Sequence, residues 1–308
     1  MLFNEGNIPE IVKKYSFKTK EVKSILNKSK GKRSFFMEDY TLNPYMGCQF
    51  DCSYCYINGS KYANNTNEYY IKVNAYQLLK TQLKNKLKKE ERGVIMVGSA
   101  SDPYMPIEEE LFLTRDILKL IERYKFAVHI ITKSDLILRD IDILKKIRQS
   151  AILPNDIKDE RLKTIISFSF STVDDEIANI FEINAPKPSK RLRAIKKLKK
   201  QGFLVGVSLM PLLPFISDTE EALNEMMKSF KDAGVDYTLP GGLTLFGNEN
   251  EGSKGCYYKK LKEFYPEHLE KTKELFVNND YPKESYFKEI NERVRKIANE
   301  YGIMVSIV

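Results

Sequence analysis

The sequence predicts an α/β fold built around a parallel sheet, and two observations lead to this prediction. Short segments rich in Ile, Val and Phe alternate along the chain with longer segments of helical periodicity. Glycines stand where several of the expected helices should end, at Gly93, Gly202 and Gly234. Repeated strand–helix–strand units form right-handed crossovers and a parallel sheet. This alternation fits an open barrel or a doubly wound sheet, and by itself it does not separate the two.

Each expected strand is a short run of β-branched and aromatic residues. In chain order the expected strands are Thr41–Gly47, Val94–Gly98, Ala127–Thr132, Thr164–Phe170, Leu204–Leu209 and Val235–Leu243. Each expected helix repeats apolar residues at helical spacing. In chain order the expected helices are Ala75–Glu90, Glu109–Arg123, Asp140–Gln149, Ser189–Gln201 and Thr219–Ala233.

Outside this core we expect an N-terminal extension of residues 1–40 and a C-terminal segment of residues 246–308, which leaves 41–245 as the barrel core. The C-terminal segment begins with an irregular stretch rich in Gly and Asn. It continues with helices around Glu267–Phe276 and Glu284–Tyr301 and a strand-like end at Ile303–Val308. Residues 148–163 have the composition of a polar loop.

Composition and charge limit the class of protein. The chain has 308 residues, 42% of them hydrophobic and 30% charged, which is typical of a globular protein and not of a disordered one. Its longest apolar stretch is too short to span a bilayer and contains prolines, so we expect no membrane helix. The first residues lack the pattern of a secretory signal, and we therefore expect a cytoplasmic protein.

The net charge of +8 raises the prospect of a polyanionic partner such as nucleic acid. Much of the surplus lies in the first forty residues and in Lys187–Lys200. In the second region, however, Leu192, Ile195 and Leu198 recur at helical spacing, which indicates a helix with one buried stripe and solvated lysines.

Three of the four cysteines lie close together, at Cys48, Cys52 and Cys55, and Cys256 is remote. In a reducing compartment such clustering indicates metal or redox chemistry. Three thiolates suit zinc or three irons of a [4Fe–4S] cluster. No fourth ligand is near in sequence, and one of the only two histidines, His129, lies in a buried strand, where a core role is expected. Three ligands leave an open coordination position, as in metal sites that do chemistry.

The segment Asn43–Tyr56, which contains the cysteines, resembles the cluster loop of the radical S-adenosylmethionine (SAM) superfamily. More closely, it resembles the branch that contains spore photoproduct lyase and its relatives called DNA repair photolyases. Further segments resemble that branch: Gly98–Glu108, Thr114-Arg115, Ile131–Asp140, Phe181-Glu182, Ala185-Pro186, Arg191, Pro211, Pro214 and Asp218. The resemblance implies a partial (β/α)6 TIM-type barrel, which matches the strands expected above.

The resemblance also implies the cofactors. Cys48, Cys52 and Cys55 would hold a [4Fe–4S] cluster, and SAM would chelate its fourth iron. Reductive cleavage of SAM would give a 5′-deoxyadenosyl radical that abstracts a hydrogen atom from the substrate. Such an enzyme needs a reducing partner such as flavodoxin or ferredoxin.

Other site residues follow from the resemblance. Tyr54 would lie near the adenine, or would be a core aromatic. Ser99 and Ser101 would contact the amino-acid part of SAM, and Lys133 its carboxylate, unless Lys133 is an ordinary strand-end lysine. Asp102 could instead only cap a turn. The expected neighbours of ribose or adenine are Ser169 and Met210.

Two residues are candidates for the radical chemistry itself. Tyr56 matches a tyrosine of the radical relay in spore photoproduct lyase. Ser99 occupies the position of the cysteine that returns a hydrogen atom in that enzyme, and its O–H bond is too strong for this task. We therefore expect that the protein is not a true spore photoproduct lyase. Cys256 is either a replacement thiol or a structural cysteine.

The substrate stays open at this stage. If it is nucleic acid, the basic residues Lys28, Lys30, Lys32 and Arg33 precede the cluster strand and are placed to reach the barrel mouth. The alternatives are a radical SAM enzyme that modifies a peptide or a small molecule, an activase that installs a glycyl radical, and a non-catalytic protein that binds zinc.

Overall fold

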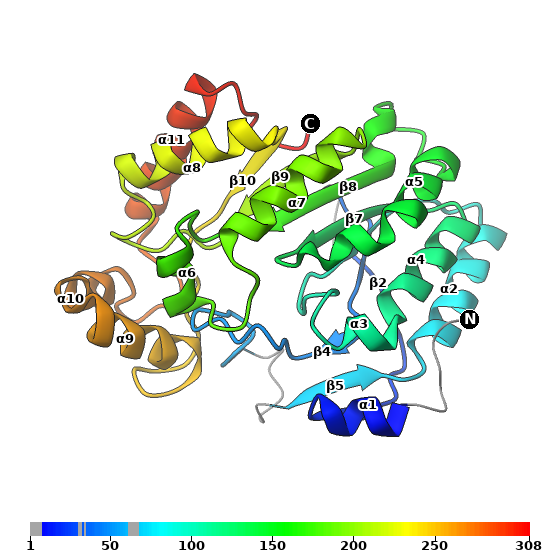
Figure 1. The fold of residues 1–308 in the computed structure, drawn as a ribbon, viewed down its shortest axis with the longest axis horizontal. Helices are drawn as coiled ribbons and strands as arrows, with labels where there is room; N and C mark the ends of the chain where they lie inside the picture. The colour runs from blue at the N-terminus through cyan, green and yellow to red at the C-terminus, as the bar shows by residue number, and fades with distance from the viewer. Residues whose placement is uncertain (1–7, 30–32, 34, 61–67) are drawn as a thin grey trace. The chain divides into compact units, whose positions relative to one another are not determined.

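A computed structural model describes residues 8–29, 33, 35–60 and 68–308. Its main sheet has seven strands in the order β10-β9-β8-β7-β6-β3-β2 (Figure 1). The pairs β3/β6, β6/β7 and β9/β10 are parallel, and β2 is antiparallel to β3. The strands are β2 (Leu26–Lys28), β3 (Tyr40–Leu42), β6 (Val94–Val97), β7 (Ala127–Thr132), β8 (Thr164–Ser169), β9 (Leu204–Leu209) and β10 (Tyr237–Pro240). The sheet is mostly parallel and open, with β2 and β10 at its edges.

The chain forms two compact units. The first consists of Met1–Gln49, Asn67–Ser167 and Lys200–Val205, and the second of Phe50–Thr66, Phe168–Lys199 and Gly206–Val308. The expected division into an extension, a core and a C-terminal segment stays a prediction.

The first unit also carries a separate three-stranded sheet in the order β1-β5-β4. Its strands are β1 (Phe17–Lys20), β5 (Tyr69–Lys72) and β4 (Tyr45–Met46), and α1 (Ile8–Lys14) precedes β1. The prediction of one strand over Thr41–Gly47 was wrong, because β3 and β4 belong to different sheets. Pro44 separates them, since it has no N–H to donate to a ladder.

The expected helices of the first unit are present with shifted ends. They are α2 (Ala75–Lys88), α3 (Glu108–Leu111), α4 (Leu113–Arg123) and α5 (Ile141–Ser150), and short 3-10 helices span Asp135–Asp140 and Glu160–Lys163. The single helix expected over Glu109–Arg123 is interrupted at Phe112, whose φ of 56° is left-handed. The polar loop expected over residues 148–163 therefore contains the end of α5 and a 3-10 helix.

The helices after β8 are α6 (Asp175–Phe181), α7 (Pro188–Lys200), α8 (Glu220–Ala233), α9 (Gly252–Phe264), α10 (Pro266–Leu275) and α11 (Glu284–Glu300). Thr219 caps α8 by accepting a hydrogen bond from the Ala222 N–H at 3.2 Å, and Gly234 ends it with a φ of 82°. Within the described residues, no helix is both long and apolar enough to span a membrane.

Two expectations for the C-terminal segment were wrong. The irregular stretch ends at Gly252, where α9 begins with a sequence of weak amphipathic pattern. Ile303–Val308 forms no strand and makes only an isolated bridge between Met304 and Tyr237. β10 ends at Pro240, although the Gly241 N–H still donates to the carbonyl oxygen of Leu209 on β9 at 3.1 Å. β10 is thus shorter at both ends than the expected strand Val235–Leu243.

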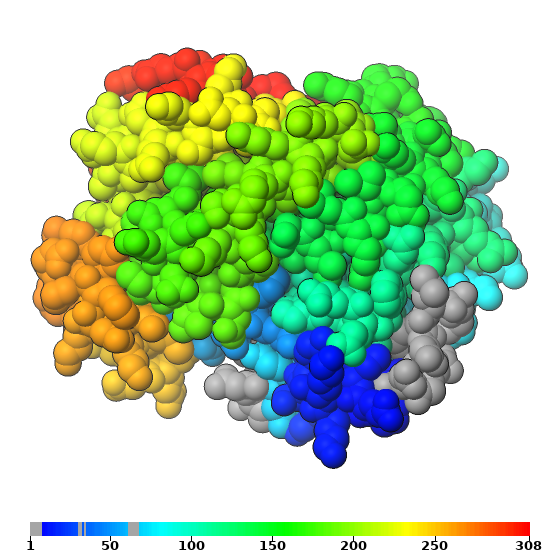
Figure 2. All heavy atoms as spheres, in the orientation of Figure 1, coloured from blue at the N-terminus to red at the C-terminus, as the bar shows by residue number. Residues whose placement is uncertain are grey.

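Most of the basic run Lys187–Lys200 forms α7 (Pro188–Lys200), which faces the viewer in Figure 1 and lies at the surface in Figure 2. Ile195 and Leu198 are buried, as expected for the apolar stripe, and Leu192 is half-buried. The expectation of solvated basic residues fails at Arg191, which is completely buried.

His129 is a core histidine, as the sequence predicts. It lies on β7 with no exposed surface, 2.7 Å from the carbonyl oxygen of Phe36 through Nδ1 and 2.7 Å from Ser167 Oγ through Nε2. Because a carbonyl only accepts, Nδ1 carries the proton and Nε2 accepts from the Ser167 hydroxyl. Burial lowers the pKa of His129 to about 4.

This histidine makes the fold sensitive to acid. The unfolded chain takes up a proton near pH 6.5 and the folded chain only near pH 4, so His129 contributes stability above pH 6.5 that is lost as the pH falls through that range. We expect a loss of about 3 kcal/mol in the free energy of unfolding between these pH values. Urea denaturation of wild type and His129→Gln at both pH values tests this, because the variant should lack this component. Equal pH dependence in the two proteins would contradict the assignment.

Candidate functional site

The three clustered cysteines lie in the loop that follows β4. Cys48, Cys52 and Cys55 are half-buried, and none of the four cysteines, all within the described residues, forms a disulfide. The described residues contain no group of three His, Cys, Asp or Glu side chains placed to hold a single metal ion. Each thiolate of an iron–sulfur cluster binds a different iron, so its ligands need not converge on one point. This donor set fits such a cluster better than a closed zinc site, which needs four converging ligands.

The first unit holds the start of this loop. The backbone N–H of Gln49 donates to Met105 Sδ at 3.1 Å, and Gln49 Oε1 accepts from the Ile107 N–H at 3.2 Å. Gly47 has a φ of +75°, and a Cβ there would lie 2.9 Å from the carbonyl oxygen of Glu68. The backbone on both sides of Cys48 is thus fixed by residues that are distant in sequence.

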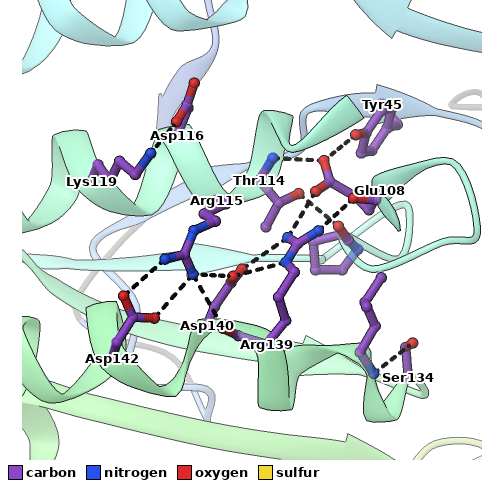
Figure 3. Close-up of polar contacts among 12 residues, drawn as sticks. Tyr45, Glu108, Thr114, Arg115, Asp116, Lys119, Ser134, Arg139, Asp140 and Asp142 are labelled. Atoms are coloured by element: carbon purple, nitrogen blue, oxygen red, sulfur yellow. Dashed lines mark hydrogen bonds and ion pairs between the residues drawn. The ribbon is translucent and has the colours of Figure 1, made fainter. Parts of the chain in front are cut away.

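A fully buried carboxylate, that of Glu108, lies next to Tyr45, which precedes the loop (Figure 3). It accepts hydrogen bonds from the Tyr45 hydroxyl, from the Thr114 N–H at 2.6 Å and from Arg139 Nη2 at 3.1 Å. Burial raises the pKa of Glu108 to about 7, although these donors act in the opposite direction.

The ion pairs continue beyond Glu108. Arg139 Nε donates to Asp140 at 2.9 Å, and Arg115 bonds the same carboxylate at 2.7 Å. Arg115 reaches Asp142 as well, at 2.8 Å (Figure 3). This network joins three of the segments on which the family resemblance rests: those around Glu108, Thr114-Arg115 and Arg139-Asp140.

Ser99 and Ser101 lie close to the loop start through Asn43. The Asn43 amide donates to Ser99 Oγ at 2.8 Å, and its oxygen accepts from the Ala100 N–H at 2.9 Å. The Ser101 hydroxyl donates to the carbonyl oxygen of Tyr45 at 3.2 Å. Asn43 therefore organises the turn after β6, a role that the sequence analysis missed.

Asp102 caps a turn, as the alternative interpretation proposed, and it also links two strand ends. Its Oδ1 accepts from the Tyr104 N–H at 2.9 Å and from the Thr132 hydroxyl at 2.7 Å. Its Oδ2 accepts from the Lys133 N–H at 2.7 Å. Gly98 is required here, because a Cβ would lie 2.3 Å from the carbonyl oxygen of Ile131. The expected SAM-binding residues Ser99, Ser101 and Lys133 thus lie on two linked strand ends.

In the second unit the loop is held by another buried carboxylate, that of Glu182. It accepts from the hydroxyl of Tyr54, from Ser171 Oγ at 2.8 Å and from Arg191. The side chains of Glu182 and Arg191 have no exposed surface. Arg191 also donates to the carbonyl oxygens of Ser169 at 3.0 Å and of Pro186 at 2.7 Å.

The loop makes backbone contacts to the same region. The Ser53 N–H donates to the carbonyl oxygen of Phe181 at 2.8 Å, and the Asn184 amide donates to Asp51 at 3.3 Å. Tyr54 itself is buried in a core cluster with Phe181 and other apolar residues of this unit, so it has the core position of the alternative interpretation. Its contact with adenine stays a prediction.

The remaining candidates also lie in the second unit. Tyr56 is 43% exposed, Ser169 is buried at the end of β8, and Met210 is half-buried after β9. Met210 contacts Gly241, where a Cβ would lie 2.5 Å from its Cγ. Cys256 is exposed on α9, and its Sγ accepts a hydrogen bond from the side-chain amide of Asn58 at 3.7 Å. Asn58 lies three residues after Cys55 in the sequence. The roles of these residues in the reaction stay predictions.

In the sequence, Gln49, Glu108, Glu182 and Arg191 stand out only as parts of the segments that resemble the family. Only Glu182 carried a signal, because it stands in the apolar run Ile180–Ile183 and a buried charge requires a partner. Glu108 and Arg191 have charged neighbours in sequence, and Gln49 has no charge. That signal does not say which partner.

Loss of the Glu182 carboxylate should destabilise the fold strongly. Glu182→Gln leaves the Arg191 charge buried without a counter-ion, and we expect a loss of about 3–5 kcal/mol in the free energy of unfolding by urea. Glu176→Gln, an exposed change on α6, is the matched control and should alter stability by less than about 0.5 kcal/mol. Similar small effects for both variants would show that the buried pair does not hold this region.

Comparison with known proteins agrees with this geometry. The radical SAM superfamily model matches residues 42–227. An uncharacterized protein of Methanocaldococcus jannaschii, MJ0683, is 33% identical over 188 residues, which are 60% of this chain and 65% of that protein. The uncharacterized protein ORF301 of Acidianus two-tailed virus is 28% identical over 243 residues, which are 73% of this chain and 74% of the viral protein.

Solved structures support the expected fold class. A cysteine-to-serine mutant of spore photoproduct lyase superposes with a TM-score of 0.68 at 16% identity, covering 98% of this chain and 84% of the lyase. A double mutant of the same enzyme with bound AdoMet and dinucleoside spore photoproduct has a TM-score of 0.64 at 17% identity. This match covers 86% of this chain and 74% of the lyase. The α/β fold with an open, partial TIM-type barrel is therefore confirmed. This chain belongs to the radical SAM superfamily, whose enzymes use a [4Fe–4S] cluster and S-adenosylmethionine.

Proposed function

We propose that the protein cleaves SAM reductively and uses the resulting radical to abstract a hydrogen atom from its substrate. The supporting observation is that Cys48, Cys52 and Cys55 are half-buried in one loop and form no disulfide. The tyrosines beside them, Tyr45 and Tyr54, are each held by a buried carboxylate of their own unit. When bound, the cluster supplies the electron that breaks a C–S bond of SAM and releases the 5′-deoxyadenosyl radical. A flavodoxin or ferredoxin is the kind of partner that would deliver this electron.

The chain's own residues would bind and orient SAM. Lys133 offers an ammonium group for its carboxylate, and Ser99 and Ser101 offer hydroxyls for its amino-acid part. Ser169 and Met210 would border the ribose or the adenine. Tyr56 is exposed, which suits a residue that meets the substrate.

Ser99 distinguishes this site from the spore photoproduct lyase pattern. Its hydroxyl oxygen accepts from Asn43, and a serine O–H bond is too strong to return a hydrogen atom to a carbon radical. We therefore assign Ser99 a binding role, so the product radical must be quenched by another group or by SAM regeneration.

One part of the nucleic-acid hypothesis loses support. Arg33 forms ion pairs with Asp39, at 3.1 Å, and with Asp156, so its guanidinium is engaged within the fold. Lys30 and Lys32 lie outside the described residues, and Lys28 is exposed on β2.

The first test concerns the cluster. Anaerobic reconstitution of Cys48→Ala, Cys52→Ala and Cys55→Ala should give low iron content and no 5′-deoxyadenosine after addition of reductant and SAM. Cys256→Ala is the matched control and should keep the iron and the product. Wild-type levels of 5′-deoxyadenosine in the three loop variants would contradict the proposal.

The second test concerns Lys133. Lys133→Gln removes a charge-assisted contact, so the dissociation constant of SAM should rise by about tenfold or more in calorimetry of the reconstituted protein. Lys146→Gln, an exposed change on α5, should leave it unchanged. Unaltered SAM affinity in Lys133→Gln would assign this lysine to the structure alone.

A further inference from the structure

The three-stranded sheet β1-β5-β4 has two different faces. On one face Phe17 contacts the rings of Tyr45 and Tyr69, with centroids 6.1 and 5.4 Å apart. Phe17, Tyr45 and Ile71 are buried, so this face belongs to the core of the first unit. Because side chains alternate along strands, the residues between these point to the opposite side.

The opposite face carries Lys18 and Lys20 of β1, and Tyr70 and Lys72 of β5; we call these four residues the lysine face. Register places Lys20 beside Lys72 and Lys18 beside Tyr70. Met46 of β4 lies next to Tyr70 in register. The two β1 lysines are exposed, and the other two residues are half-buried. A row of cations with an aromatic ring between them is typical of surfaces that bind single-stranded nucleic acid.

The charges on the lysine face are only partly neutralised. Lys18 forms an ion pair with Glu68, and Lys20 Nζ lies 5.5 Å from the centre of the Tyr70 ring. Neither Lys20 nor Lys72 has a carboxylate partner within the described residues. Lys72 Nζ donates instead to the carbonyl oxygen of Asn43 at 2.6 Å.

Like charges on paired residues destabilise a sheet. Burial, and in second place the charge of Lys20, lower the pKa of Lys72 to about 8. The Lys72 ammonium group is therefore still present at pH 7, where the charge of the neighbouring Lys20 repels it. A bound anion would remove this repulsion, and within the described part of the chain no carboxylate does so.

The lysine face adjoins the candidate site. Met46, beside Tyr70, is two residues before Cys48, and Lys72 contacts Asn43, whose side chain holds Ser99. A ligand that covers this face would therefore reach the start of the cysteine loop.

We propose that the lysine face binds the phosphate backbone of a single-stranded nucleic acid, with Lys20 and Lys72 contacting phosphate and Tyr70 stacking on a base. Lys18 and Lys20, at alternate positions of β1, stand about 7 Å apart, so the positive charge extends along the strand and suits successive phosphates of a polymer better than one phosphate group. The inference rests on the proposed function, because it names the class of substrate presented to the radical.

The test measures binding of a fluorescent oligothymidylate by anisotropy at several KCl concentrations, with the full chain and no SAM. The double change Lys20→Gln and Lys72→Gln should weaken binding about tenfold or more and reduce the slope of log K against log salt by about 1.4. The pair Lys196→Gln and Lys197→Gln removes the same charge from exposed positions of α7 and should change the affinity less than about twofold. Circular dichroism checks that both double variants are folded.

Further variants separate the contacts. The double change Lys20→Arg and Lys72→Arg should retain binding, because arginine also contacts phosphate. Tyr70→Leu should weaken binding without changing the salt slope, because stacking releases no counterions. Equal losses in the lysine-face and α7 variants, or wild-type affinity in the lysine-face variant, would overturn the proposal.

These measurements are independent of the proposed chemistry. If the protein forms 5′-deoxyadenosine but the lysine-face variant binds the oligonucleotide as tightly as wild type, only this inference is rejected. A protein that binds through the lysine face but never forms 5′-deoxyadenosine contradicts only the proposed function.

Discussion

Two buried carboxylates, one within each compact unit, hold parts of the segment that carries the cysteines, and the local order of this segment depends on their pairing. Glu108 receives the hydroxyl of Tyr45 before the loop, and Glu182 receives that of Tyr54 within it. A buried carboxylate without partners costs several kcal/mol, so each carboxylate is paired with an arginine, Arg139 for Glu108 and Arg191 for Glu182. Moving either carboxylate or its arginine would leave a buried charge without its partner. The tyrosines bonded to these carboxylates are therefore held in place.

Within each unit, further buried polar contacts fix neighbouring segments. Arg191 also bonds the carbonyl oxygen of Ser169 at the end of β8, and Asp102 joins the ends of β6 and β7. Fully satisfied buried networks of this kind define one arrangement of their members, because every alternative leaves a polar group unpaired. Reactive radicals require such order around them, since water and stray groups would otherwise quench them. The lysine face, by contrast, has cations that the described fold does not neutralise, as expected of a surface that meets a ligand.

How well each element could be predicted depended on its length and burial. β8 and β9 consist entirely of buried residues, and continuous apolar runs of this kind identify central parallel strands. β1 has only one buried residue in the sequence FKTK, so no pattern marks it as a strand. α9 was missed because glycines and polar residues interrupt its apolar side. The break at Asn43-Pro44 was visible in the sequence, but only the pairing partners show that β3 and β4 join different sheets.

The sequence by itself determined the α/β class, the cysteine triplet and the resemblance of the segments around it, because these depend on local spacing and residue type. The tertiary structure decided which residues meet. It showed that Arg191 of a lysine-rich helix is buried against Glu182, that Tyr54 belongs to a core, and that Lys20 and Lys72 stand side by side. Local periodicity tells whether a side chain is buried. The partner of a buried charge, or the neighbour across a sheet, is set by contacts between segments tens of residues apart, which no local pattern encodes.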